Sequence, residues 1–229
     1  MKRFWTDVGV VEDGGFAVAL DGRRLMTPAR AALVLPTREL ADAVAAEWRE
    51  CGETVDPRAM PLTGLANAAI DRVAPQPDKF AAGLAQYGES DLLCYRADSS
   101  SALAERQAES WDPLLAWARR RYDVDFSITA SIIHAAQPRA TIERLAHAVA
   151  ALDPFRLAGL APVVEIGGSL VAALALLEGA ASAEQAWQAV SLDERWQLQK
   201  WGSDAEAEAV LERRRHDFLA AAKFLKLLD

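Results

Sequence analysis

The stretch FWTDVGVVEDGGFAVALDGRRLMTP, residues 4–28, decides the fold of the first part of the chain. Its short apolar runs alternate with Glu-Asp-Gly-Gly and Asp-Gly, and Asp-Gly is typical of a tight hairpin because both residues tolerate a positive φ angle. We therefore predict strands near residues 3–11, 15–20 and 23–27. The sequence LVLP, residues 33–36, adds a further short strand.

A helix should cover this small sheet. Thr37 precedes RELADAVAAEWRE, in which Leu40, Val44 and Trp48 recur every fourth residue and therefore lie on one helical face. A second helical stripe follows, and its members are Leu62, Leu65, Ala66, Ala69 and Ile70. The two prolines of VAPQPDK then mark the best candidate for a linker, so we predict a small, β-rich α+β domain over residues 1–74.

The remainder, residues 78–229, carries repeated signals for helix starts. Asp112-Pro113 and Asp153-Pro154 each place an acid before a proline, an arrangement that suits the first turn of a helix. Three further pairs fit the capping box, namely Ser182 with Gln185, Ser191 with Glu194 and Ser203 with Glu206. The fold class predicted for the whole chain is α+β: a small N-terminal β-hairpin sheet with helices, followed by a mostly α-helical C-terminal domain.

Composition and charge limit the classes of function that the chain can have. The 229 residues are 52% hydrophobic and 25% charged, which is typical of a globular protein, and the net charge of −8 repels nucleic acid and anionic lipid. Cys51 and Cys94 form no Cys-x-x-Cys pair, so a reducing compartment is expected. MKRFWTDVGV lacks the apolar core of a signal peptide, and the most apolar run contains Glu165 and is too short to span a bilayer. We expect a cytoplasmic protein that does not insert into membranes.

Motifs for catalysis are missing from the sequence. It contains no phosphate-binding loop, no Gly-x-Gly-x-x-Gly and no His-Glu-x-x-His, and His134, His147 and His216 are widely separated. We therefore expect no catalytic residue, no metal and no cofactor. Gly167-Gly168-Ser169 is most simply a turn and a helix cap, although the helix start could also face an anion. An enzyme with a fold-assembled anion or small-molecule site near Gly167–Ser169 is thus one alternative, and a generic protein adaptor is another.

For two groups of side chains we expect a structural role and not a functional one. The tryptophans at 48, 111, 117, 187, 196 and 201 mostly occupy positions that helical spacing turns inward, so most of them should belong to the core. Glu47 and Glu50 should form a solvated face of their helix.

A series of segments resembles one known family. The segments are RFW, LDGRRLMTP, LPTRELADAVAAEW, MPLTGLANAAID, DLLCYR, WDPLLAW, GGSLVAALAL and ERWQLQKWGSD, and they follow one another over nearly the whole chain. The family comprises the assembly chaperones of the F₁ head of the F-type ATP synthase that receive its newly made α subunit. The resemblance implies a chaperone that binds free α subunit, shields the surface destined for the β subunit, and does not hydrolyse ATP.

The candidate partner-binding residues lie near the C-terminal end of the chain. WQLQKWG, residues 196–202, should close one helix, and SDAEAE, residues 203–208, should begin the next, where acids are stabilised by the helix dipole. The resemblance implies that an acid shortly after the Trp-Gly pair is functionally important. The candidates are the acids Asp204, Glu206 and Glu208, of which Glu206 is favoured. Trp201 is the fourth candidate, and we expect it to fix the angle between the two helices. We expect a monomer, cytoplasmic in bacteria and mitochondrial in eukaryotic relatives.

Overall fold

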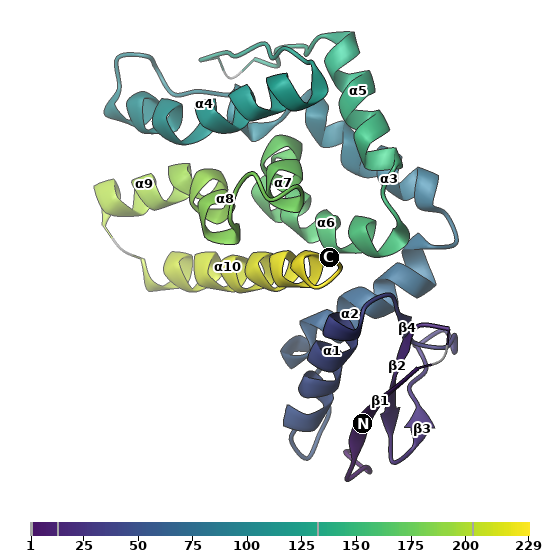
Figure 1. Ribbon diagram of the computed structural model, residues 1–229. Helices are drawn as coiled ribbons and strands as arrows, with labels where there is room; N and C mark the ends of the chain where they lie inside the picture. The colour runs from purple at the N-terminus through teal and green to yellow at the C-terminus, as the bar shows by residue number, and fades with distance from the viewer. Residues whose placement is uncertain (1, 13, 132, 203) are drawn as a thin grey trace. The chain divides into compact units, whose positions relative to one another are not determined.

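The computed structural model describes residues 2–12, 14–131, 133–202 and 204–229 (Figure 1). The chain divides into two compact units. Unit 1 is formed by Met1–Pro77, Asp153–Gly159 and Lys223–Asp229, and unit 2 is formed by Asp78–Leu152 and Leu160–Ala222. The predicted pair of independent domains, 1–74 and 78–229, stays a prediction, because it concerns how the chain folds and not only which residues pack together.

Unit 1 contains the small antiparallel sheet that the sequence predicts. Its strands are β1 (Val8–Glu12), β2 (Phe16–Leu20), β3 (Arg23–Arg24) and β4 (Val34–Leu35), with β2 paired to each of the others. Asp21 and Gly22, with φ angles of 47° and 78°, make the expected tight turn. The first strand begins at Val8 and not at residue 3, because the N–H groups of Thr6 and Asp7 donate to the Asp21 carboxylate, at 3.0 and 2.8 Å.

Helix α1 (Arg38–Glu50) covers this sheet, as predicted (Figure 1). Thr37 caps the helix, its hydroxyl oxygen accepting the Leu40 N–H at 3.3 Å, and Leu40, Val44 and Trp48 are all buried. The second predicted stripe forms helix α2 (Pro61–Ala68) and a π-helical turn, Ala69–Val73. The sequence pattern therefore identifies both helices of this segment.

The expectation that Glu47 belongs to a solvated face is wrong. Its carboxylate oxygens accept the N–H groups of Leu62 and Thr63, both at 2.8 Å, and the Thr63 hydroxyl at 2.6 Å. Glu47 thus satisfies the free N–H groups at the start of α2, which has no cap from its own preceding side chain. Sequence spacing within α1 gives no sign of this contact, because its partner lies on another helix. Glu50 is exposed, as expected.

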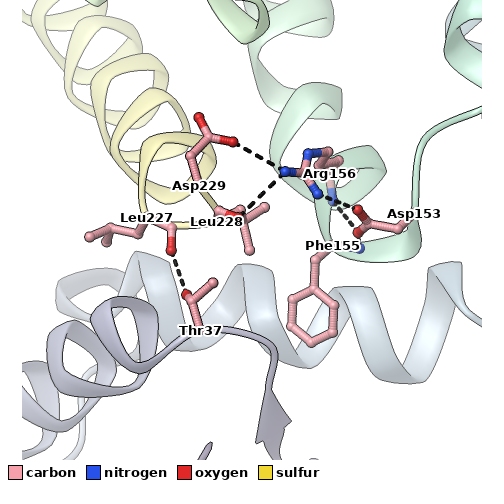
Figure 2. Close-up of polar contacts among 7 residues, drawn as sticks. All are labelled: Thr37, Asp153, Phe155, Arg156, Leu227, Leu228 and Asp229. Carbon is pink, nitrogen blue, oxygen red and sulfur yellow. Dashed lines mark hydrogen bonds and ion pairs between the residues drawn. The ribbon is translucent and has the colours of Figure 1, made fainter. Parts of the chain in front are cut away.

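Unit 1 is completed by two segments that lie far away in the sequence. Figure 2 shows the Thr37 hydroxyl donating to the carbonyl oxygen of Leu227 at 2.5 Å, so the residue that caps α1 also binds the end of the chain. Nearby, the Phe155 and Phe224 rings stack with centroids 6.4 Å apart and planes 11° apart.

Arg156 links these two segments. Its guanidinium donates to Asp153 at 2.7 Å, to Asp229 at 3.1 Å and to the Leu228 carbonyl at 3.4 Å (Figure 2). Asp153 also accepts the N–H groups of Phe155 and Arg156, which confirms the helix start predicted at Asp153-Pro154. Residues 153–159 and 223–229 are therefore bound into unit 1 by both aromatic and polar contacts.

Unit 2 is helical. Its helices are α3 (Pro77–Ala85), α4 (Ala102–Tyr122), α5 (Arg139–Ala150), α6 (Pro154–Gly167), α7 (Leu170–Leu177), α8 (Ala183–Val190), α9 (Leu192–Trp201) and α10 (Ala205–Lys226), and the ends of α3, α6 and α10 extend into unit 1. All residues of α7 from Leu170 to Ala175 are buried, so this helix forms the centre of the unit. The Trp111 side chain, fully buried, donates to the Ala189 carbonyl at 2.8 Å.

One predicted helix start and one predicted capping box in unit 2 are wrong. Pro113 lies inside α4, which begins at Ala102 with Ser101 as its cap. The proline is tolerated because Pro113 and Glu109, whose carbonyl loses its partner, are both exposed to water. Ser191 does precede α9, but its hydroxyl donates to the Trp187 carbonyl at 2.7 Å and makes no cap. The capping box of Ser182 and Gln185 is confirmed, whereas the one predicted at Ser203 lies outside the described residues.

Candidate partner-binding site

The helix break predicted after the Trp-Gly pair is present. Helix α9 ends at Trp201, Gly202 has a φ angle of 91°, and α10 begins at Ala205 (Figure 1). A positive φ of this size favours glycine, so the sequence itself ends α9 at this point. The structure does not describe the side chain of Trp201, and the angle-fixing role assigned to it stays a prediction.

Asp204 caps helix α10. Its carboxylate oxygen Oδ1 accepts the N–H of Glu206 at 3.0 Å, which satisfies one of the free N–H groups at the helix start. Among the described residues the capping role therefore belongs to Asp204.

Glu206 and Glu208 present their charges to solvent. Both side chains are exposed, and no hydrogen bond or ion pair to either carboxylate is recorded within the part of the chain that the structure describes. Both lie in the first turn of α10, where the helix dipole stabilises a negative charge without neutralising it. The predicted acids are thus a cap, Asp204, followed by two exposed carboxylates.

A groove runs between α9 and α10 beside these acids. Its volume is about 620 Å³, and it is lined by Glu194, Gln197, Leu198, Gly202, Asp204, Glu206, Ala207, Val210, Leu211 and Arg214. The apolar members include Val210, which is 41% exposed although it is a large hydrophobic side chain. Glu208 does not line the groove. The structure therefore brings Asp204 and Glu206 together with an apolar surface.

Among the described residues that line the groove, one is basic, namely Arg214. Its guanidinium is bound to the carboxylate of Glu194 and donates to the Ile166 carbonyl at 2.8 Å. The second oxygen of Glu194 is buried and has no hydrogen-bond partner among the described residues. Because the Arg214 charge is paired with Glu194, Asp204 and Glu206 leave the groove with a net negative charge.

The apolar part of this groove was not predicted from the sequence. Ala207, Val210, Leu211 and Arg214 follow the spacing i, i+3, i+4 and i+7 along α10 and share one face, which is a helical stripe that the pattern could have revealed. The facing residues of α9 could not be paired with this stripe from sequence, because their proximity depends on how the two helices pack.

The tryptophans divide into two groups. Trp48, Trp111 and Trp187 are buried, as predicted, whereas Trp117 and Trp196 are half-buried. The Trp196 ring of α9 lies 4.7 Å from the Arg106 guanidinium and 5.0 Å from the Lys200 amine. It is therefore engaged by cations of the chain and does not line the acidic groove.

The alternative anion site at Gly167–Ser169 is occupied by a side chain of the protein. Ser169 caps α7, as predicted, by accepting the Ala172 N–H at 3.0 Å. The next free N–H, that of Val171, donates at 2.9 Å to Asp91, and both Asp91 and Ser169 are fully buried. The helix start does face an anion, but the anion is the carboxylate of Asp91, so this position offers no site for a ligand.

The environment of Asp91 also disfavours the charged form of its carboxyl group. Burial raises the pKa of Asp91 from 3.8 to about 6, although hydrogen bonds from Val171, Ser169 and Leu93 oppose this effect. Elsewhere in the described chain no group of three or more His, Cys, Asp or Glu side chains is arranged to hold a metal ion. Within the same residues, no helix has the length and hydrophobicity needed to cross a bilayer.

A family model described as "ATP12 chaperone protein" matches residues 2–119, which is more than half of the chain. The chain belongs to the ATP12 chaperone family. This family consists of non-enzymatic assembly factors of F₁-ATPase. The family membership predicted from the resemblance is therefore confirmed.

Solved structures and a curated relative agree with this assignment. Atp12 from Paracoccus denitrificans is 44% identical and superposes with a TM-score of 0.94, over 100% of this chain and 98% of that one. The same values hold for a mutant of that protein in which an aspartate is replaced by lysine. A protein from Agrobacterium tumefaciens is 40% identical, with a TM-score of 0.93 over 100% of this chain and 86% of that one. Mitochondrial atp12 of Schizosaccharomyces pombe is 27% identical over 91% of this chain and 76% of its own length.

Proposed function

We propose that this chaperone binds the unassembled α subunit of F₁-ATPase and covers the surface that the α subunit later presents to the β subunit. The family assignment supports a partner among the ATP synthase subunits. The observation that carries the more specific proposal is the acidic surface at the start of α10, where the Glu206 and Glu208 carboxylates are exposed beside an apolar groove.

A surface of this composition suits temporary binding. Apolar side chains such as Val210 contribute contact area, while the acids orient a positively charged partner and speed its encounter. A holding chaperone needs only enough affinity to keep the bound subunit from aggregating until it is assembled. The incoming subunit then displaces the chaperone by competing for the same surface. Release by competition requires no ATP. We further propose that the chaperone acts as a monomer, in the compartment where the F₁ subunits are made, which is the cytoplasm in bacteria.

The proposal is tested by light scattering of purified α subunit during unfolding. Wild-type chaperone at near-stoichiometric amounts should suppress the scattering, and β subunit added afterwards should recover assembled α–β complex. Bovine serum albumin at the same concentration serves as the unspecific control. Unchanged scattering in the presence of excess chaperone would contradict the proposed function. Pull-down and mass spectrometry from native extract would then identify the partner of a generic adaptor.

A further inference from the structure

The groove between α9 and α10 has two chemically distinct ends. Asp204 and Glu206 lie at the start of α10, whereas Arg214 lies further along the same helix and is paired with Glu194. Between the two ends lie aliphatic side chains, of which Val210 is 41% exposed. The negative charge is therefore concentrated at one end, and the remainder of the groove is apolar or neutral.

The backbone of the groove limits the conformation of an occupant. Both walls are α-helices, whose interior N–H and C=O groups are already paired within each helix. An extended segment would find no strand edge to pair with and would leave its own backbone groups unsatisfied on burial. A helix satisfies its backbone internally, and an amphipathic helix in a groove is an established mode of recognition.

We propose that the α9–α10 groove receives an amphipathic helix of the F₁ α subunit. The helix has an aliphatic face that packs on Val210 and Leu211, and its lysine or arginine side chains lie over Asp204 and Glu206. From Asp204 to Arg214 the groove follows α10 for about 15 Å, which is the length of roughly ten helical residues. This inference rests on the proposed function, and it adds the conformation, chemistry and orientation of the bound segment.

Two matched lysine substitutions on α10 test the groove. Val210→Lys places a positive charge on the apolar floor, where it should repel the cationic helix and block packing. Ala209→Lys adds the same charge at the neighbouring exposed position, which does not line the groove. Binding of purified α subunit should weaken by about tenfold or more in Val210→Lys, since hot-spot changes have effects of this size. It should remain within about twofold of wild type in Ala209→Lys.

The possible outcomes distinguish a failure of the groove inference from a failure of the proposed function. If wild type and both variants bind α subunit equally, the groove inference is overturned while the proposed function stands. If wild type itself does not bind α subunit, both are overturned. Circular dichroism checks that Val210→Lys is folded. If Val210→Lys is unfolded, Val210→Ser is used in its place, because it removes the apolar contact without adding a charge. Weaker binding of Val210→Ser supports the inference, and wild-type binding contradicts it.

Discussion

Asp91 shows how a single carboxylate can stabilise two local structures at once. One oxygen accepts the Leu93 N–H at 3.0 Å, and the other accepts the Val171 N–H at 2.9 Å at the start of α7. The residue is fully buried, and the pKa of about 6 means that the folded protein binds a proton there more tightly than the unfolded chain, for which the ordinary value is 3.8.

This difference predicts a pH dependence of stability. Between about pH 4 and 6 the folded state retains the Asp91 proton while the unfolded state releases it, so the free energy of unfolding should fall as pH rises, by at most ~1.4 kcal/mol per pH unit from this group. Burial raises the pKa of neighbouring Cys94 to about 12, so its thiol does not titrate in this range. Denaturant unfolding of wild type and Asp91→Asn across this range provides the measurement. The slope should differ between the two proteins, and identical pH profiles would contradict the assignment.

The role of Glu47 also depends on contacts across the fold. Its helical position is compatible with solvent, and only the packing of α2 against α1 brings its carboxylate to the free N–H groups of Leu62 and Thr63. A sequence read one helix at a time cannot identify this cap. The cap that Thr37 makes on its own helix is local by contrast, because the hydroxyl and the N–H of Leu40 are three residues apart.

Among the helices and turns, the boundaries agree with the sequence pattern where no contact elsewhere in the fold favours a different backbone conformation. The Asp21-Gly22 turn, the start of α6 at Asp153 and the break at Gly202 are determined by residues that strongly favour one backbone conformation. Pro113 carries a similar signal, but it lies inside α4, which begins at Ala102. Ser191 does precede α9, but its hydroxyl is bound to the Trp187 carbonyl and makes no cap. The proline therefore marks no helix start within α4, and the serine marks a helix start that it does not cap.

Thr37 offers a test of the contact between the start of α1 and the segment of residues 223–229 within unit 1. Thr37→Val keeps the shape of the side chain but removes both the cap on α1 and the hydrogen bond to Leu227. We expect it to lower the free energy of unfolding by about 1–3 kcal/mol. Thr37→Ser retains the hydroxyl and should change it by less than about 1 kcal/mol. Equal stability of the two variants in urea unfolding would show that neither hydrogen bond contributes.

At the scale of the whole molecule, the two halves of the site were not equally predictable. The acids after the Trp-Gly pair could be found from sequence, because the resemblance and the helix start indicate the same short segment. The groove could not, since it exists only where α9 packs beside α10. Likewise, nothing in the local pattern of residues 153–159 or 223–229 indicates that they belong to unit 1, although Phe155 and Phe224 stack within it.

The central claim is that exposed acids at the start of α10 bind the α subunit. Glu206→Gln removes a charge but leaves the cap made by Asp204, so the free energy of unfolding should change by less than about 1 kcal/mol. Glu109→Gln is the matched control, because Glu109 is also exposed on a helix of unit 2 and does not line the groove. Both variants lose one negative charge, so a general effect of net charge would alter them equally.

The most direct measurement is the affinity of purified α subunit for wild type, Glu206→Gln and Glu109→Gln, determined by calorimetry at one fixed ionic strength. We predict that Glu206→Gln weakens binding by about tenfold or more, that is, by at least ~1.4 kcal/mol, because it leaves a cation of the partner unpaired in the interface. Glu109→Gln should bind as wild type does. If Glu206→Gln binds as tightly as Glu109→Gln, its carboxylate takes no part in recognising the α subunit and the account is contradicted.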